Sequence, residues 1–409
     1  MALICAVIVA YFFVAGRIPG DSMDVAWENY EIWAIDEGDR ERPHDGDGSW
    51  LVGDTLVRSG FNGAAGQDAG TGRKVWEYRS PGSSKLCAAV ADVEHSVLVV
   101  TRDDENRPAS ARRQLCSTLA GVDMKNGREI WRTQVPAAPR EGRPVYNERV
   151  QVTAGGGLTV LTHQGLRAVD VRTGAPRWTA ALPPNCVPAL ARPALRHVGA
   201  LLACDGTEKK PNGIADDAEL HAAAFNPATG KLLWSTPIGD RDPETWRSGD
   251  VRLLSADPLV VGTVKDTYSF NGDGRPNPTL GGTSTSSHSV MDDTMLYTAD
   301  LTGGGTGRSG RKSPYTHAVR ALDLTTGRIA WVSDLDFDIH ALHLRDGKLT
   351  VVGEDRELYL YTAPKLYVLD AATGKELDAR RFHYGVVPVG DAFEYKDLLI
   401  VGSEAYRRS

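Results

Sequence analysis

The chain has no long run of lysine and arginine and no excess of positive charge. Its 409 residues carry 46 Lys and Arg against 53 Asp and Glu, a formal net charge of −7 at pH 7. A nucleic-acid-binding surface needs concentrated positive charge to neutralise phosphates. We therefore expect no nucleic-acid partner.

Cysteine is scarce, and its spacing excludes a common use. The chain has five cysteines, none of them adjacent to another or in a Cys-x-x-Cys pair. Zinc sites normally draw on such pairs or on histidines at a matching spacing, so we expect no metal site. Apart from Cys5, four cysteines remain, and an even number in an exported chain indicates disulfides.

No hydrophobic run reaches the roughly 20 residues of a typical transmembrane helix. The most apolar segment is MALICAVIVAYFFVAG, residues 1–16, which has no charged side chain. We expect residues 1–17 to be a membrane anchor on a chain otherwise outside the cytoplasm, with a cleaved signal segment and a secreted protein as the alternative. Residues 18–47 form an acidic connector, in which residues 26–35 (AWENYEIWAI), with Trp27 and Trp33, have the composition of a strand.

The dominant feature of the sequence is one hairpin that recurs along the chain. Its clearest copy is AVRALDLTTGRIAW, residues 318–331. An apolar strand leads to Asp323, whose carboxylate can accept hydrogen bonds from turn amides, and Gly327 allows positive φ at the corner. The second strand ends on Trp331, a large ring to bury.

Copies of this hairpin recur about every 50 residues, a period typical of four-stranded propeller blades. The turn glycines are Gly72, Gly127, Gly174, Gly230, Gly327 and Gly374. The tryptophans that end the second strand are Trp76, Trp131, Trp178, Trp234 and Trp331, and the copy at residues 366–378 lacks the aromatic. Gly230 and Gly327 are about two periods apart, and a degraded copy, YSFNGDGR, lies between them at residues 268–275.

A second set of short apolar runs predicts the number of blades. The runs would form the strand upstream of each hairpin, at residues 53–58, 96–102, 157–163, 200–206, 258–264, 294–300, 348–354 and 397–403. Eight runs and seven hairpins predict eight blades, the last completed by the strand at residues 26–35, because closing a sheet with both termini removes exposed edges. Seven blades is the alternative.

The hairpin, of the form ALDxxTGxxxW, resembles the repeat of the PQQ-like (quinoprotein-like) β-propellers, in their membrane-anchored or secreted bacterial form. The resemblance extends from about Trp50 to the C-terminus and implies an all-β, eight-bladed propeller at residues 48–409. The family includes pyrroloquinoline-quinone (PQQ) dehydrogenases, an outer-membrane assembly lipoprotein and kinase sensor domains. It therefore implies fold more strongly than function.

The blade arrangement selects one of the three ways to pair four cysteines. Cys87 and Cys116 lie in one repeat, and Cys186 and Cys204 lie in a later one. We expect the pairs Cys87–Cys116 and Cys186–Cys204, each joining outer and inner parts of a blade.

The resemblance also implies what an enzyme of this fold would need. A quinoprotein dehydrogenase is expected to carry an adjacent-cysteine disulfide over PQQ, a tryptophan beneath it and a calcium-binding set of Glu, Asn and Asp. This chain has no adjacent cysteines, and its repeat tryptophans share one position, which indicates packing between blades. We predict no PQQ, no calcium and no catalytic residues, with a PQQ-dependent oxidoreductase as the alternative.

Two weaker signals favour structural roles. Asn271 to Gly274 resembles a calcium loop, but Arg275 stands where a third ligand would be needed. His221 has no serine or aspartate partner by motif. The expected function is therefore binding: an extracytoplasmic propeller acting as a scaffold or sensor for a protein, peptide or cell-envelope ligand.

Overall fold

The computed structural model describes residues 23–28, 48–60, 62–82, 84–102, 116–135, 151–162, 165–206, 217–238, 251–263, 266–281, 289–302, 316–335, 338–354, 365–382, 392–401 and 404–407. Within these ranges the chain is all-β, with 32 strands. The apolar segment 1–17 lies outside the described residues. Among the residues that are described, no helix has the length and apolar character needed to cross a membrane.

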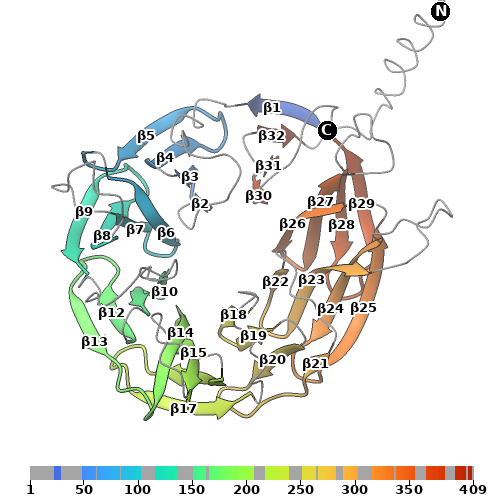
Figure 1. Ribbon diagram of the computed structural model, residues 1–409. Helices are drawn as coiled ribbons and strands as arrows, with labels where there is room; N and C mark the ends of the chain where they lie inside the picture. Colours follow the sequence, from blue (N-terminus) through green and yellow to red (C-terminus); the bar gives the residue numbers. More distant parts are fainter. Residues whose placement is uncertain are drawn as a thin grey trace, which may run out of the picture. The chain divides into compact units, whose positions relative to one another are not determined.

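The strands form eight four-stranded antiparallel sheets, each of them one propeller blade (Figure 1). The all-β fold and the eight blades are confirmed, and the seven-bladed alternative is wrong. The chain divides into two compact units, which we describe separately: the first comprises Met1–Asn29, Gly70–Gly72 and Ser284–Ser409, and the second Tyr30–Ala69 and Arg73–Thr283.

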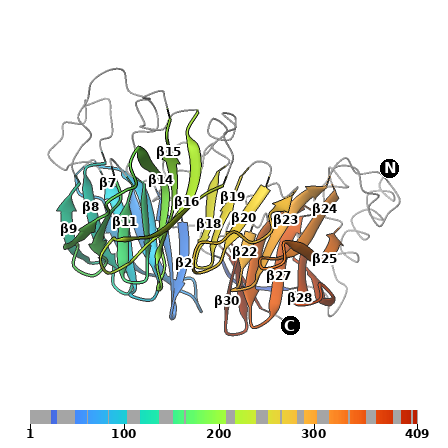
Figure 2. The same cartoon turned by 90° about the horizontal axis from the view of Figure 1, so that it is seen from below.

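The second unit holds five blades, each with its strands in chain order. Their strands are β2 (Gly48–Val52), β3 (Thr55–Gly60), β4 (Gly63–Asp68) and β5 (Lys74–Arg79); β6 (Leu86–Asp92), β7 (Val97–Arg102), β8 (Thr118–Asp123) and β9 (Glu129–Gln134); β10 (Val152–Gly155), β11 (Leu158–Leu161), β12 (Arg167–Asp170) and β13 (Pro176–Thr179); β14 (Cys186–Pro193), β15 (Val198–Cys204), β16 (Glu219–Phe225) and β17 (Leu232–Pro237); and β18 (Arg252–Ala256), β19 (Leu259–Gly262), β20 (Asp266–Phe270) and β21 (Leu280–Gly281). Figure 2 shows several of these strands from the side.

The first unit holds three blades. Their strands are β22 (Ser289–Met291), β23 (Met295–Thr302), β24 (Thr316–Asp323) and β25 (Arg328–Leu335); β26 (Asp338–Arg345), β27 (Lys348–Glu354), β28 (Lys365–Asp370) and β29 (Glu376–Arg381); and β30 (Ala392–Tyr395), β31 (Leu398–Val401), β32 (Glu404–Arg407) and β1 (Asp24–Glu28).

Each of the eight apolar runs from which we predicted the number of blades corresponds to the second strand of a sheet. All residues of β7 and β15 are buried, for example, because each strand is flanked by two strands of its own sheet and packed on both faces. A strand covered on both faces reads as a continuous apolar run rather than an alternating one. The number of these strands could therefore be predicted from the sequence.

Each hairpin tryptophan packs against the turn glycine of the blade that follows it. The ring of Trp76 lies over the turn glycine of the following blade, so that a Cβ atom on Gly127 would fall 2.5 Å from Trp76 Cε3. Its Nε1 donates a hydrogen bond to the carbonyl oxygen of Met124, 3.0 Å away. The same pair of contacts, ring on glycine and Nε1 on a turn carbonyl, is made by Trp131 with Gly174 and Val171, Trp178 with Gly230 and Pro227, and Trp331 with Gly374 and Ala371.

The degraded copy keeps this contact. Gly274 has φ +84°, and a Cβ there would fall 2.4 Å from the Trp234 ring. The side-chain oxygens of Asn271 and Asp273 both accept hydrogen bonds from the Arg275 amide, so they are engaged in the turn itself.

The strand β1 completes the blade formed by the C-terminal strands, pairing antiparallel with β32. It spans residues 24–28, whereas we expected a strand at 26–35, and Trp33 lies outside the described residues. Trp27 is buried and covers Gly72, where a Cβ would fall 2.4 Å from its ring. Trp27 thus repeats the contact that the hairpin tryptophans make elsewhere.

Candidate functional site

The two disulfides have the predicted pairing, but their location differs from our expectation. Cys87 of β6 is bonded to Cys116, and Cys186 of β14 to Cys204 of β15. We expected each bond to join outer and inner parts of a blade. Instead, Cys186 and Cys204 face each other on neighbouring first and second strands, and Cys116 precedes the third strand β8. Neither bond reaches an outer strand.

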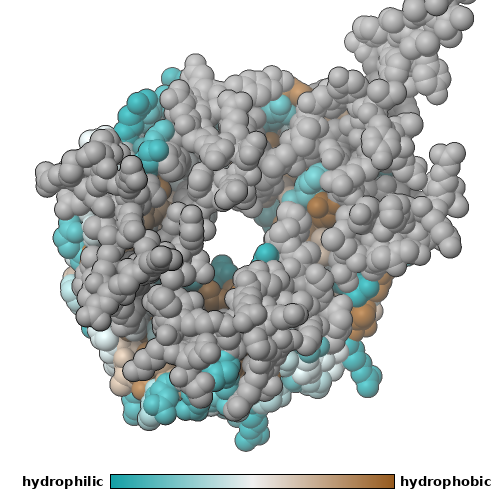
Figure 3. Space-filling view, in the orientation of Figure 1, coloured by the Kyte–Doolittle hydropathy of each residue, from teal (hydrophilic) through white to brown (hydrophobic). Residues whose placement is uncertain are grey.

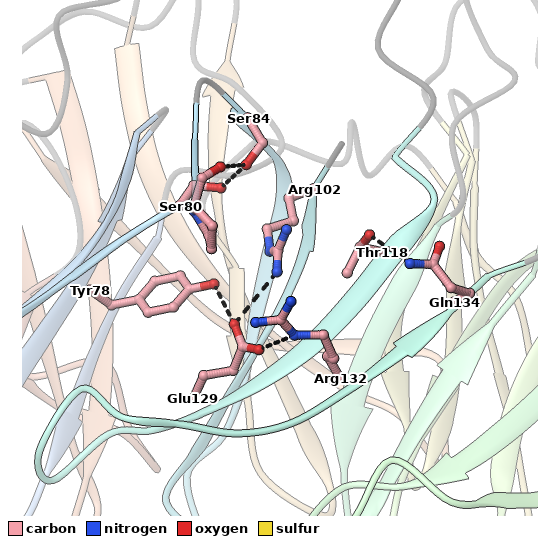
Figure 4. Close-up of polar contacts among 9 residues, drawn as sticks. Tyr78, Ser80, Ser84, Arg102, Thr118, Glu129, Arg132 and Gln134 are labelled. Atoms are coloured by element: carbon pink, nitrogen blue, oxygen red, sulfur yellow. Dashed lines mark hydrogen bonds and ion pairs between the residues drawn. The ribbon is translucent and has the colours of Figure 1, made fainter. Parts of the chain in front are cut away.

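A buried polar cluster ties the β2–β5 blade to the β6–β9 blade (Figure 4). Its centre is Glu129 of β9, which accepts hydrogen bonds from the Tyr78 hydroxyl at 3.1 Å and from Arg132 Nε at 2.5 Å. Arg102, whose side chain has no exposed surface, places Nη2 3.6 Å from the same carboxylate. Burial, and then the negative charge of Glu129, raise the pKa of Tyr78 to about 12. The residues of this cluster are engaged with one another and hold strands of the two blades together.

His221 has polar partners that sequence motifs did not reveal. Its Nδ1 lies 3.2 Å from the Ser235 hydroxyl and its Nε2 3.6 Å from a Glu219 oxygen. The two ring nitrogens are reversed relative to a serine triad, in which Nε2 contacts the serine and Nδ1 contacts the acid. The 3.6 Å separation from Glu219 is also too long for a hydrogen bond. We assign no catalysis to His221.

One cluster of potential metal ligands lies in the turn between β6 and β7. Ligand atoms of Asp92, Glu94 and His95 are within 4.8 Å of one another. Asp92 Oδ1 accepts a hydrogen bond from the His95 amide, and Oδ2 accepts one from the Gly157 amide at 2.9 Å. The buried carboxylate therefore joins this turn to the turn between β10 and β11.

That link is the first of three contacts between turns of successive blades. Each of these turns connects the first strand of its blade to the second strand. A Cβ on Gly156 would lie 3.0 Å from the Ala194 carbonyl, so the β10–β11 turn packs directly on the β14–β15 turn. The β14–β15 turn in turn reaches the β18–β19 turn through an ion pair between Arg196 and Asp257. We call the surface formed by Val93–His95, Gly155–Gly157, Ala194–Arg196 and Asp257 the turn surface.

The centre of the turn surface is an exposed leucine on a fixed base. Leu195 is 71% exposed, the highest value among the large hydrophobic side chains of the described residues. Its neighbour Arg196 donates from Nε to Asp257 Oδ2 at 2.6 Å and from Nη2 to Oδ1 at 2.5 Å. Two parallel charge-assisted bonds fix the geometry of the guanidinium. On the same blade as Arg196, Arg192 Nη1 donates a hydrogen bond to the Leu254 carbonyl at 3.0 Å, which adds a second link to the β18–β21 blade.

A second apolar side chain, Val93, is 46% exposed on the same surface, on the other side of the glycine turn 155–157. Large apolar side chains that are exposed together on one surface are a feature of protein-binding sites. This site could not be predicted from sequence, because its residues come from four separate turns. The one local signal was Leu195 itself, an apolar residue in a turn that otherwise reads as polar.

Neither the repeat tryptophans nor the cysteines of the described residues form the two PQQ-binding features expected of a quinoprotein dehydrogenase. The repeat tryptophans are engaged between blades through their rings, and four of them also donate Nε1 to turn carbonyls. The four cysteines of the described residues form two bonds across 18 and 29 residues of sequence. Neither group can supply the ring floor or the adjacent-cysteine cover, so no chemical step is assigned through PQQ.

Comparison with known families gives a match over the first five blades. The family described as Outer membrane protein assembly factor BamB matches residues 51–185 and 117–280, which together span more than half of the chain. No curated protein matches this chain.

Solved structures show the same fold at low sequence identity. BamB from Moraxella catarrhalis is 12% identical, with a TM-score of 0.54 over 94% of this chain and 99% of that one. The computationally designed Ika8 protein is 12% identical, with a TM-score of 0.57 over 89% and 97%. Quinohemoprotein alcohol dehydrogenase ADHIIG from Pseudomonas putida HK5 is 11% identical, with a TM-score of 0.51 over 95% and 76%. The eight sheets, the repeated hairpin and the family match together show that the chain belongs to the PQQ-like β-propeller family of the outer membrane protein assembly factor BamB.

Proposed function

We propose that this chain is an extracytoplasmic scaffold that binds a protein partner through the turn surface. The observation that carries the proposal is Leu195, 71% exposed beside the Arg196–Asp257 ion pair. An apolar anchor mounted on a rigid base loses little conformational freedom when it is buried by a partner, and such anchors contribute most of the affinity of protein interfaces.

Two further observations favour this role. The chain has two disulfides, which are typical of proteins in oxidising compartments, and this favours a location outside the cytoplasm. The matched family is named for an assembly factor of outer membrane proteins, a role that is exercised on other proteins. On this proposal residues 1–17 attach the scaffold to the membrane, with secretion as the alternative. A protein partner is favoured over a peptide or cell-wall ligand, because the exposed groups of the turn surface are spread over four turns.

The surface can be tested by substituting its anchor. The full chain, immobilised, would be exposed to an envelope extract of its own source, and any specifically bound protein would be titrated against wild type and variants. Leu195→Asp should weaken binding by about 10-fold or more, because a charge would be desolvated at the centre of the interface. Leu233→Asp, at a leucine 51% exposed on the outer strand β17, is the matched control and should bind as wild type. Equal binding by both variants would refute the assignment of this surface.

A further inference from the structure

We propose that the Cys186–Cys204 disulfide is a thiol–disulfide exchange site for a dithiol partner, whereas Cys87–Cys116 is a structural bond. Among the described residues of the face drawn in Figure 3, hydrophobic residues lie in several separate places rather than in one patch. A reactive group is therefore a more specific guide to a further site than apolar exposure. The partner class is a molecule with two neighbouring thiols, such as a reduced Cys-x-x-Cys pair in another protein.

Access distinguishes the two disulfides. Cys186 is partly exposed, whereas Cys204, Cys87 and Cys116 have only 1%, 5% and 2% of their surface exposed. The rate of exchange depends on whether an attacking thiolate can reach one of the two sulfur atoms. The Cys186–Cys204 bond offers such a sulfur at Cys186, and the Cys87–Cys116 bond is buried at both ends.

The Cys186–Cys204 bond closes the open end of the β14–β15 hairpin. The two cysteines are directly opposite each other in the register of these strands. Just beyond them, the Asp205 amide donates a hydrogen bond to the Asn185 carbonyl at 3.0 Å, and both of these flanking residues are exposed. Backbone pairing continues on the other side, toward the β14–β15 turn. This pairing should keep the two thiols opposite each other after reduction, so that the bond can re-form without unfolding.

The Cys87–Cys116 bond lacks this arrangement. Cys87 lies in the first strand β6 and Cys116 lies two residues before the third strand β8, and the second strand β7 lies between β6 and β8 in the sheet. The register of two neighbouring strands therefore does not hold these thiols opposite each other once their bond is broken.

The exchange requires only the dithiol as reductant. A thiolate of the partner attacks Cys186 Sγ, the disulfide breaks, and Cys204 leaves as a thiolate that takes up a proton. The second thiol of the partner then attacks the mixed disulfide and releases Cys186, which takes up the other proton. Two electrons pass from the partner to this chain, and the partner becomes a disulfide; an oxidised partner reverses the reaction.

The loosening that follows reduction should be confined to the start of β14. Closer to the turn, Thr153 Oγ1 donates a hydrogen bond to the Ala191 carbonyl at 2.7 Å, and Arg192 is bonded to the Leu254 carbonyl. These bonds hold the part of β14 that leads to Leu195 independently of the disulfide. The exchange site and the turn surface can therefore fail separately.

The first test follows reduction of the folded full chain by dithiothreitol. Samples are quenched with acid at successive times, alkylated, and read for each cysteine by peptide mass spectrometry. Cys186–Cys204 should open at least about 10-fold faster than Cys87–Cys116, and should re-form when oxidised dithiothreitol is added in excess. Equal rates, faster opening of Cys87–Cys116, or no opening of Cys186–Cys204 below the melting temperature would overturn the proposal.

A matched pair of variants tests which sulfur is attacked. Cys204→Ser and Cys186→Ser lack the same bond and differ only in the thiol that remains. With glutathione disulfide as the probe, the Cys186 thiol of Cys204→Ser should form a mixed disulfide at least about 10-fold faster than the Cys204 thiol of Cys186→Ser. Equal rates, at equal melting temperatures of the two variants, would contradict attack at Cys186. The wild-type measurement decides the proposal if either variant fails to fold.

Discussion

At the scale of single residues, the contact between a hairpin tryptophan and the next turn glycine explains why the repeat is so regular. Gly127 has φ +72° and lies directly beneath the ring of Trp76. Two separate demands therefore fall on this position: a left-handed backbone, and the absence of a Cβ atom. Glycine meets both, and no other residue does.

The two demands can be separated by comparing two glycines. Gly347 has φ +70° but nothing within 4 Å of the Cβ position. Gly347→Ala should cost about 1–2 kcal/mol of unfolding free energy, the strain of a left-handed alanine. Gly127→Ala should cost roughly 1–3 kcal/mol more, because the Trp76 ring must also move. Urea denaturation of both variants measures the difference, and equal losses would show that the ring contact is unimportant.

Tyr78 gives a prediction about pH. Its pKa is raised to about 12 by burial and by Glu129, whereas an unfolded tyrosine ionises near pH 10. The neutral phenol thus stabilises the fold fully below pH 10, and this contribution is lost as the pH rises from 10 to 12. Between pH 10 and pH 12 the free energy of unfolding should therefore fall less in Tyr78→Phe than in wild type, by roughly 2 kcal/mol. Urea unfolding at successive pH values measures this difference.

The wild-type comparison is needed because Tyr297 also has a pKa raised to about 12 and remains in the variant. As a second variant, Glu129→Gln removes the charge but not the burial, so Tyr78 should ionise at lower pH than in wild type. Identical alkaline profiles for wild type and Tyr78→Phe would contradict the raised pKa of Tyr78.

At the scale of strands, the hairpins and second strands were predictable because their signals are local and repeated. The run 97–102 (VLVVTR), apolar over its first four residues, and the Asp-to-Trp hairpin from 123 to 131 each fit within one window of sequence. The turn surface was not predictable, because Arg196 and Asp257 are 61 residues apart and meet only when adjacent blades pack. His221 and Ser235 meet for a similar reason, through the register of β16 and β17. The disulfide pairing followed from repeat positions, but its place within the blade depended on strand order.

The disulfides act on the same scale, by tying the first strands of two blades. The loops that they close contain 18 and 29 residues, and the chain-entropy relation gives about 3 kcal/mol for each bond. The double variant Cys186→Ser and Cys204→Ser should therefore melt at a lower temperature than wild type under oxidising conditions. With reductant present the two proteins should differ much less, since wild type then loses the same bond. A melting temperature unchanged by the substitutions would indicate that the bond contributes no stability.

At the scale of the whole molecule, the eight blades supply a repeated framework whose turns carry the variation. Three consecutive turn contacts, from Asp92 to Gly157, from Gly156 to Ala194 and from Arg196 to Asp257, join four blades of the second unit. On our account this continuity holds Leu195 and Val93 at a fixed separation for a partner.

The most direct test of protein binding at the turn surface is photo-crosslinking in cells that express the full chain. A benzoylphenylalanine residue would replace Leu195 in one strain and Leu233 in a control strain, and the adducts would be identified by mass spectrometry. We predict a discrete adduct with one other protein from position 195 and none from position 233. No adduct from position 195, or the same adducts from both positions, would contradict the assignment of this propeller as a scaffold that binds its partner through Leu195.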